Sequence, residues 1–481
     1  MIKKLFVSLS MLLFLSCIRA PDIKEPEVDI SPPDSWIAGD ARSPSQKNEE
    51  NSDWWQHFHD PALDSLIRES LRHNHNLQAA SARVDMAISQ ARISSAELYP
   101  QLNGGVTAAR RKQQIFGMPS IGGTGESSVS TMTSNNFGAS LDVSWEIDLW
   151  GRIRSGRSAA LADVQASQVD WYGAKLSLTG QLAKMWYAAI ELNRQVDLSQ
   201  AALENYQLSV RRIKERYEKG LVSSLDYRMA ESAVATAEAN FLARQQQLES
   251  ARRQLEIMLG RYPAAEIEIN KNAVPHLEYV PAGLPAELVS KRPDLISAER
   301  RIAAAKKRVS QAKASLYPRI ALTGSAGQSS SELENLLDGD FSVWSIIGNI
   351  VHPLFQGGRL LAGVKSAQSN AEMQLAQFAQ SLLNAYAEVE NALAAERYLA
   401  GQETALETAA HQAAAACELA EDRYRRGLVN VFSMLEAQRN SLQAESQLIN
   451  IRRQRIDARV DLCLGLGGGI DMSGVLGESK K

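Results

Sequence analysis

The chain has few cysteines, few aromatic residues and no excess of positive charge. Three cysteines and 6% aromatic residues occur in 481 positions. So few aromatic rings do not suit one large globular core. Lys and Arg number 52 against 55 Asp and Glu, giving a net charge of -3. This balance argues against a nucleic-acid partner, because neutralising phosphates requires an excess of cationic side chains.

The sequence also lacks an apolar run long enough to cross a membrane as a helix. About 18 to 20 consecutive apolar residues are needed for that. The apolar stretch LFVSLSMLLFLS falls short of this length and follows the positively charged start MIKK. Residues 1–16 are therefore predicted to be a secretory signal peptide.

Cys17 directly follows this segment, and the letters FLSC resemble the lipobox of bacterial lipoproteins. In that motif the chain is cleaved before the cysteine, which then carries lipid on its sulfur and on its new amino group. Phe14 stands where Leu is commonest. Ile18, instead of Asp, follows the cysteine, which favours sorting to the outer membrane. The alternative is a simple secreted protein in which this cysteine stands by chance.

Residues 17–50 are rich in proline and charge, with Pro32 and Pro33 adjacent, and predict an extended tether from the lipid anchor. The other two cysteines, Cys417 and Cys463, lie on either side of Gly427. If Gly427 is a turn between helices, they stand about 15 and 54 Å from it along those helices. A disulfide needs Cα atoms within about 7 Å, so both are predicted to be free, packed thiols.

The chain repeats itself once. AELYPQL returns as ASLYPRI, so that Tyr99 matches Tyr317, and YEKGLVSSLD at Tyr217 returns as YRRGLVNVFS at Tyr424. The offset is 218 residues before the Tyr-Pro pairs and 207 after the Gly-Arg pair at Gly151. The first copy is therefore longer only between these two points. A repeat of this length indicates two copies of one structural unit.

Each copy starts with helical spacing, in 63–97 and 284–316, which ends at Tyr-Pro because proline disfavours the α region in the residue before it. NNFGASLDVSWEIDLWG then alternates seven apolar residues with polar or small ones, which predicts a strand with one apolar face. Four strands are expected, in β-hairpins at about 99–150 and 317–357. The less regular stretch 342–355 leaves open which of its faces meets lipid.

Between Gly151 and Tyr217, and again between Gly358 and Tyr424, no proline occurs. One helix over either stretch would be about 100 Å long. Gly220 and Gly427 suit left-handed helix ends, so each copy is expected to form a very long α-hairpin with its tip at 217–226 or 424–433.

The chain is thus expected to begin with a signal peptide (1–16) and a tether (17–50). The first structural repeat (51–261), a connecting segment (262–283), the second structural repeat (284–466) and a tail (467–481) follow. Membrane sheets must close, and bacterial barrels start at eight strands, so four strands cannot close alone. The predicted fold is α plus membrane β-barrel, a homotrimer with a 12-stranded barrel on a periplasmic helical tunnel.

These motifs resemble the TolC-like outer-membrane efflux proteins, in the lipoprotein branch that serves resistance-nodulation-division pumps. The resemblance rests on SDWWQHFHDPALDSLI (52–67), LPAELVSKRPDLISAE (284–299), both Tyr-Pro pairs and both tips, and covers nearly all of the mature chain. It implies a homotrimeric, energy-free conduit in the cell outer membrane that extends into the periplasm. It also implies two partners, a periplasmic adaptor protein and an inner-membrane resistance-nodulation-division transporter.

The resemblance also places a narrowing at the periplasmic end, lined by residues after the second tip glycine. Its matching positions are Phe432 and Glu436, with Asp226 as a further candidate from the first copy. Some relatives carry Asp where Ser433 stands here, so one acidic ring is expected instead of two. A solvated acid near a helix start is the alternative for Glu436.

Exposed apolar residues at a tip need a partner, so the tips are expected to contact the adaptor, with local packing of the turn as the alternative. The residues concerned are Gly220, Leu221, Val222, Gly427, Leu428 and Val429.

The histidine pairs around His57 and His73 are too closely spaced for a metal site, and GLGGG at Gly465 lacks the Lys of a phosphate loop. No catalytic pairing, metal or cofactor is predicted.

Two other functions remain open from the sequence. A channel of the same fold could serve type I protein secretion, although the lipobox and the Arg-Pro-Asp-Leu segment favour export of drugs or other small molecules. A periplasmic coiled-coil scaffold would need soluble hairpins, which the unbroken apolar alternation opposes. The exported compounds cannot be named from the sequence.

Replacing Cys17 by Ser is expected to abolish lipid attachment. Cells grown with radioactive palmitate should label the parent and not Cys17→Ser, while the barrel and tunnel still assemble, because acylation adds an anchor and does not build the fold. Undiminished labelling of the variant would show that FLSC is not a lipidation site.

Overall fold

The computed structural model describes residues 33, 35–38, 53–115, 130–269, 275, 277 and 291–468. The predicted signal peptide, Cys17, most of the predicted tether and the stretch 469–481 lie outside the described residues. The chain forms two compact units. Unit 1 contains Asp85–Val164 and Arg300–Ala376, and unit 2 contains Val28–Val84, Gln165–Glu299 and Gln377–Lys481.

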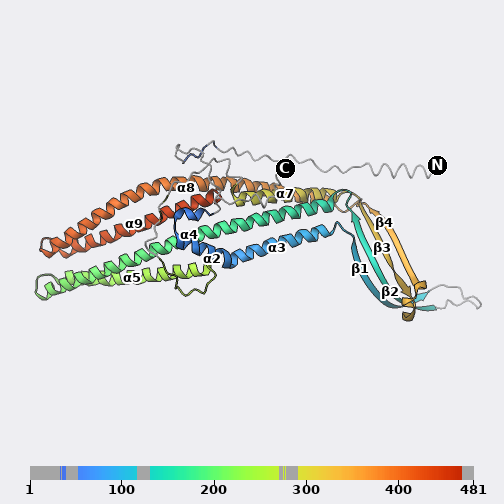
Figure 1. Cartoon of the computed structure of the whole chain (residues 1–481), viewed down its shortest axis with the longest axis horizontal. Coiled ribbons are helices and arrows are strands. Elements are labelled where there is room, and N and C mark those ends of the chain that lie inside the picture. The colour runs from blue at the N-terminus through green and yellow to red at the C-terminus, as the bar shows by residue number, and fades with distance from the viewer. Residues whose placement is uncertain are drawn as a thin grey trace, which may run out of the picture. The chain divides into compact units, whose positions relative to one another are not determined.

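The elements follow the twofold repeat of the sequence (Figure 1). The first copy has η1 (Trp54–Phe58), α2 (Pro61–His73), α3 (His75–Ala96), β1 (Gln101–Ile115), β2 (Ser130–Ile147), α4 (Arg152–Glu218) and α5 (Ser224–Met258). The second has α7 (Pro293–Ala314), β3 (Arg319–Ser330), η3 (Leu333–Leu337), η4 (Gly339–Phe341), β4 (Ser342–Val351), α8 (Arg359–Arg425) and α9 (Val431–Gly465). Helices α4 and α8 each have 67 residues, or about 100 Å, as the proline-free stretches predicted.

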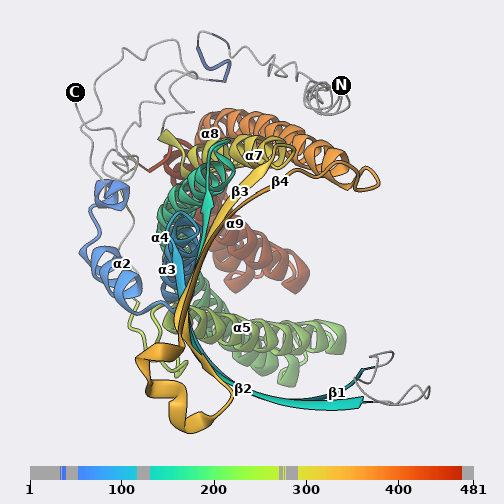
Figure 2. The ribbon, with the colours of Figure 1, turned by 90° about the vertical axis from the view of Figure 1, so that its right-hand side faces the viewer.

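Unit 1 carries one antiparallel sheet in the order β1-β2-β3-β4, which confirms the four expected strands (Figure 1). Figure 2 shows that this sheet is curved. Residues directly opposite one another point to the same face of a sheet. One such row is Leu102, Val143, Gly324 and Ile346, and the next is Gly104, Leu141, Ala326 and Trp344. A row on the other face is Asn103, Asp142, Ser325 and Ser345. The apolar face predicted for β2 therefore continues across the other three strands.

The register also decides the face of β4 that its sequence left open. Trp344, Ile346 and Ile350 share a face with Leu141 and are 77%, 71% and 72% exposed. Val343 and Ile347 lie on the face that carries the polar rows. The apolar residues of β4 occupy both faces, so its own pattern could not show which one continues the apolar face of β2.

Two tryptophan side chains form hydrogen bonds to the backbone at the two Tyr-Pro turns of unit 1. The Trp145 indole donates to the Leu98 carbonyl at 3.0 Å, and the Trp150 indole donates to that of Pro318 at 2.8 Å. The Trp150 ring also stacks on Tyr317, with ring centres 4.9 Å apart. Amphipathic aromatic rings are typical of the level at which a membrane sheet meets water.

The helical stretch predicted from 63 to 97 is two helices, because Asn74 interrupts it. Asn74 has an extended backbone (φ -67°, ψ 121°), and its side-chain oxygen accepts from the Leu77 N–H at 3.1 Å, which caps α3. Its side-chain nitrogen donates to the Met258 carbonyl at the end of α5, at 2.9 Å. The sequence pattern missed this break because the apolar spacing continues through it. No helix among the described residues is both long and apolar enough to cross a membrane.

The second copy repeats this junction with a different side chain. Arg292 stands where the first copy has Asn74, just before α7, and donates to the carbonyl of Gly465 at 3.2 Å. Gly465 is in turn the counterpart of Met258. Arg292 is 8% exposed and bonded to Glu388 at 2.7 Å and to Asp294. We call these two arrangements the helix junctions, since each holds the end of a hairpin helix against the helix that leads to the strands.

The core of unit 2 includes aromatic side chains next to the first helix junction. Trp186 is 1% exposed and donates to the carboxylate of Asp60 at 2.8 Å, which also caps α2.

Both described cysteines are free, as predicted. Burial raises the pKa of the Cys463 thiol to about 12 and that of Cys417 to about 11, which keeps both thiols protonated at neutral pH.

Each helix junction also contains a glycine, Gly260 in the first copy and Gly467 in the second, and a methyl group at either is expected to destabilise the protein. A Cβ on Gly467 would lie 2.4 Å from the Lys291 carbonyl oxygen, and one on Gly260 would lie 2.6 Å from that of His73. Both glycines have positive φ, 88° and 74°. Gly467→Ala should therefore lower the free energy of unfolding by at least about 2 kcal/mol, measured by circular dichroism of the detergent-extracted protein.

Gly363→Ala in α8 is the matched control, because a Cβ there meets nothing within 4 Å. It should be neutral or stabilise by about 0.5–1 kcal/mol, through lower entropy of the unfolded chain. Equal melting of Gly467→Ala and the parent would contradict the close approach at the second junction.

Candidate functional site at the hairpin tips

Both hairpin tips end in the same left-handed turn. Gly220 and Gly427 have φ angles of 70° and 76°, which confirms the glycine helix ends expected there. The Leu221 N–H donates to the Arg216 carbonyl at 2.9 Å, and the Leu428 N–H donates to that of Arg423 at the same distance. The N–H groups of Gly220 and Gly427 donate to the Tyr217 and Tyr424 carbonyls, at 2.8 and 3.0 Å, which completes the Schellman pattern of helix termination.

The leucine and the valine of each tip point in different directions. Leu221 and Leu428 are 67% and 69% exposed. Val222 and Val429 instead pack on a buried cluster, which we call the tip core, made of Ile213, Ala230, Tyr424, Val431 and Met434. The two valines therefore pack locally within the turn, which was the alternative to contact with the adaptor. The two leucines remain exposed in the single chain.

Different side chains start the two helices that leave the tips. The Ser223 hydroxyl accepts from the Asp226 N–H, and the Asp226 carboxylate accepts from the Ser223 N–H, each at 3.2 Å. This is a capping box, so the Asp226 carboxylate is bound to the start of α5. At the counterpart position in α9, the Ser433 N–H donates to the Asn430 side chain at 2.9 Å.

Polar contacts join the two hairpins close to the tips. Arg216 of α4 donates to the Tyr424 carbonyl of α8 at 3.1 Å and lies 5.0 Å from the centre of its ring. Glu421 of α8 accepts from Asn205 at 2.9 Å and from Gln438 at 2.7 Å. One carboxylate of α8 thus links α4 and α9.

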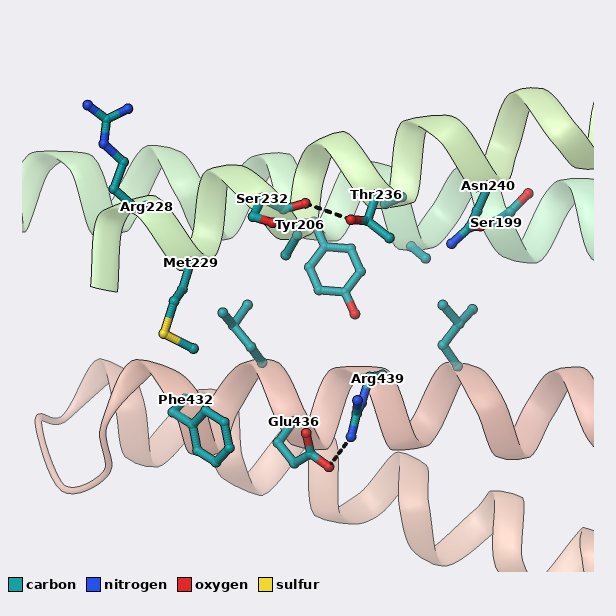
Figure 3. A pocket seen from close by; sticks show the side chains of 15 residues that line it. Ser199, Tyr206, Arg228, Met229, Ser232, Thr236, Asn240, Phe432, Glu436 and Arg439 are labelled. Carbon is teal, nitrogen blue, oxygen red and sulfur yellow. Dashed lines mark hydrogen bonds and ion pairs between the residues drawn. The ribbon is translucent and has the colours of Figure 1, made fainter. Parts of the chain in front are cut away.

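A cavity of about 570 Å³ lies between α4, α5 and α9, and it brings together Phe432 and Glu436 of α9 with Met229 and Tyr206 (Figure 3). Phe432 is 57% exposed. Glu436 is half-buried and accepts from the Arg439 guanidinium at 2.6 Å, as Figure 3 also shows. Its charge therefore has a counter-charge on the same helix. Asp226 is not among the residues that line this cavity.

Of the residues that line the cavity, sequence reasoning named only Phe432 and Glu436, and it missed Met229 and Tyr206 among the others. Met229 is the counterpart of Glu436 in the first copy, so the repeat offset could have pointed to it. Tyr206 is 8% exposed, and its burial raises the pKa of its hydroxyl. Its counterpart in α8 is Ala413, and no motif marks it. Among the described residues, no group of three metal-ligating side chains could hold an ion.

The family described as Outer membrane efflux protein matches residues 66–261 and 284–468 of this sequence. The chain belongs to that family. It is 31% identical to the pyoverdine export outer membrane protein OpmQ of Pseudomonas putida over 95% of this chain and 96% of that protein. Outer membrane protein OprJ of Pseudomonas aeruginosa is 32% identical, over 95% and 94%.

Solved structures agree with this assignment. The outer membrane channel CmeC of Campylobacter jejuni matches with a TM-score of 0.84 and 25% identity over 95% of this chain and 96% of that one. The open state of the outer membrane channel MtrE of Neisseria gonorrhoeae matches with 0.78 and 26%, over 94% and 98%. The chain is thus an outer-membrane efflux channel protein, and the fold class predicted from its repeats is confirmed. A soluble coiled-coil scaffold is not compatible with this family.

Proposed function

We propose that this family member works as a homotrimeric, passive conduit of a tripartite efflux pump. The observation that carries the proposal is the sheet, in which β1 and β4 each have a single neighbour. An unpaired strand edge in hydrocarbon leaves N–H and C=O groups without partners, so the edges must pair with those of other copies. Three chains supply twelve strands, which exceeds the minimum of eight for a bacterial barrel.

The cargo is proposed to be small molecules. Relatives over nearly the full length are named for export of pyoverdine and of toluene. These names support small-molecule efflux over type I protein secretion. We further propose that the chain catalyses no reaction and needs no cofactor, and that an inner-membrane resistance-nodulation-division transporter supplies the energy.

A periplasmic adaptor is proposed to bind at the tips through Leu221 and Leu428. Each tip exposes one leucine, an apolar side chain that favours contact with a partner over contact with water. Gly220 and Gly427 would contribute by keeping the turn tight. Val222 and Val429, which belong to the packing of the tip core, would act by holding the turns in shape.

The periplasmic gate is proposed to consist of Phe432 and Glu436. They are four residues apart on α9, and therefore on one face, and they line the same cavity. Threefold symmetry would bring three copies of each toward the axis, where the Phe432 rings close the passage by bulk. Arg439 lowers the repulsion within the Glu436 ring, although an exposed pair of this kind contributes only about 0–1 kcal/mol.

Removing both gate side chains is expected to open the resting channel. The double variant Phe432→Ala, Glu436→Ala should show higher single-channel conductance in planar bilayers than the parent. Glu436→Ala alone should weaken block by multivalent cations added from the periplasmic side, because the acidic ring is lost while Arg439 remains.

Leu225→Ala is the matched control, since Leu225 is the counterpart of Phe432 in the first copy and is 66% exposed. It should conduct like the parent. If the double variant also conducts like the parent and keeps its cation block, the gate lies elsewhere, and Asp226→Ala then tests the remaining acidic candidate.

The adaptor contact predicts a separation of folding from efflux. Leu221→Ser with Leu428→Ser should keep the melting temperature of the parent, lose co-purification with the adaptor and sensitise cells to exported compounds. Val222→Ser with Val429→Ser should instead lower the melting temperature, because polar groups enter the tip core. Unchanged adaptor binding by the double leucine variant would contradict the proposed surface.

A further inference from the structure

A short segment of the N-terminal tether is bound to the surface of unit 2. Trp36 is 8% exposed, and its ring meets that of Tyr386 edge-on, with ring centres 6.2 Å apart. The two residues that follow are held by one carboxylate. The backbone N–H groups of Ile37 and Ala38 donate to the two oxygens of Glu390, each at 2.8 Å.

The groove under Trp36 is built by three helices. Leu382, Ala385 and Val389 recur on α8 at a helical spacing of three and four residues, which puts them on one face. Leu295 of α7 and Leu462 of α9 complete the cluster, with 0% and 2% exposure. An indole ring is the kind of side chain that fills such an apolar groove.

The internal repeat explains why the indole ring of Trp36, which belongs to the tether, occupies this groove. In the first copy, Trp54 of η1 lies on α4 and its indole donates to Thr179 at 3.3 Å. The sequence at the counterpart of η1 in the second copy is NAVPH, residues 272–276, which contains no tryptophan. Tyr386, which Trp36 contacts, is the counterpart of Thr179. Trp36 therefore supplies to the second copy the ring that its own sequence lacks.

We propose that residues 35–38 form a strap, and that the groove of α7, α8 and α9 with Glu390 is its binding site. The strap attaches the N-terminal segment to the second repeat independently of any lipid on Cys17. The 19 residues from Cys17 to Trp36 can span at most about 63–68 Å.

Hydrogen exchange of the full-length protein in detergent, resolved to single amides by mass spectrometry, tests the strap. In Cys17→Ser, which has no lipid, the amides of Ile37 and Ala38 should exchange at least about tenfold more slowly than in the unfolded chain. Exchange of both at the unfolded rate would overturn the proposal, because the lipid and not the groove would then hold the segment.

Variants in the same background separate the two contacts. Trp36→Ala and Glu390→Ala should each remove the protection of Ala38, and Trp36→Phe should restore most of it. Ile37→Ala is the matched control, since that side chain is 86% exposed, and it should keep the protection. Persistent protection in Trp36→Ala, or its loss in Ile37→Ala, would show that the groove does not bind the strap through Trp36.

Discussion

Every backbone N–H and C=O group that faces hydrocarbon must find its hydrogen-bond partner within the protein, and the rest of this molecule depends on that constraint. β2 and β3 satisfy it on both sides, and their pairing joins the two copies of the repeat in one sheet. β1 and β4 have one neighbour each, so duplication of the unit leaves two open edges. An efflux channel protein with this sheet can satisfy its backbone only by association with further copies.

The helix junctions of the two copies have the same geometry, although different residues form them. An amide side chain, Asn74, in the first copy and a guanidinium, Arg292, in the second donate to corresponding carbonyl groups. A glycine with positive φ follows in each, because a Cβ would meet a carbonyl oxygen within 2.6 Å. The strap fits the same scheme, since Trp36 completes in the second copy a groove that Trp54 covers in the first.

The two long hairpins differ in what holds their helices together. Arg459 of α9 donates to Glu396 of α8 at 2.7 and 2.6 Å, and Arg452 donates to Glu403 at 3.0 Å. The counterparts of these two acids in α4 are Ala189 and Val196, so the first hairpin has no such ion pairs at these positions. The bidentate Arg459 pair is 8% and 21% exposed, where a salt bridge is less screened than at the surface. The hairpin that carries Phe432 and Glu436 is thus fixed by directional contacts.

The sequence by itself determined the repeat, the strand alternation in β2, the long helices and the glycine tips, because each depends on local periodicity or on the conformational freedom of one residue. The break at Asn74 was not predicted from the sequence. Its side chain caps α3 at the Leu77 N–H and also donates to the Met258 carbonyl, which is far away in the chain. The faces of β4 were decided by register against β3, and the split between tip leucines and valines by the tip core. Phe432 and Glu436 could be named from the motif, but Tyr206, Arg439 as the counter-charge, and the groove for Trp36 required tertiary structure, because they depend on which helices pack side by side.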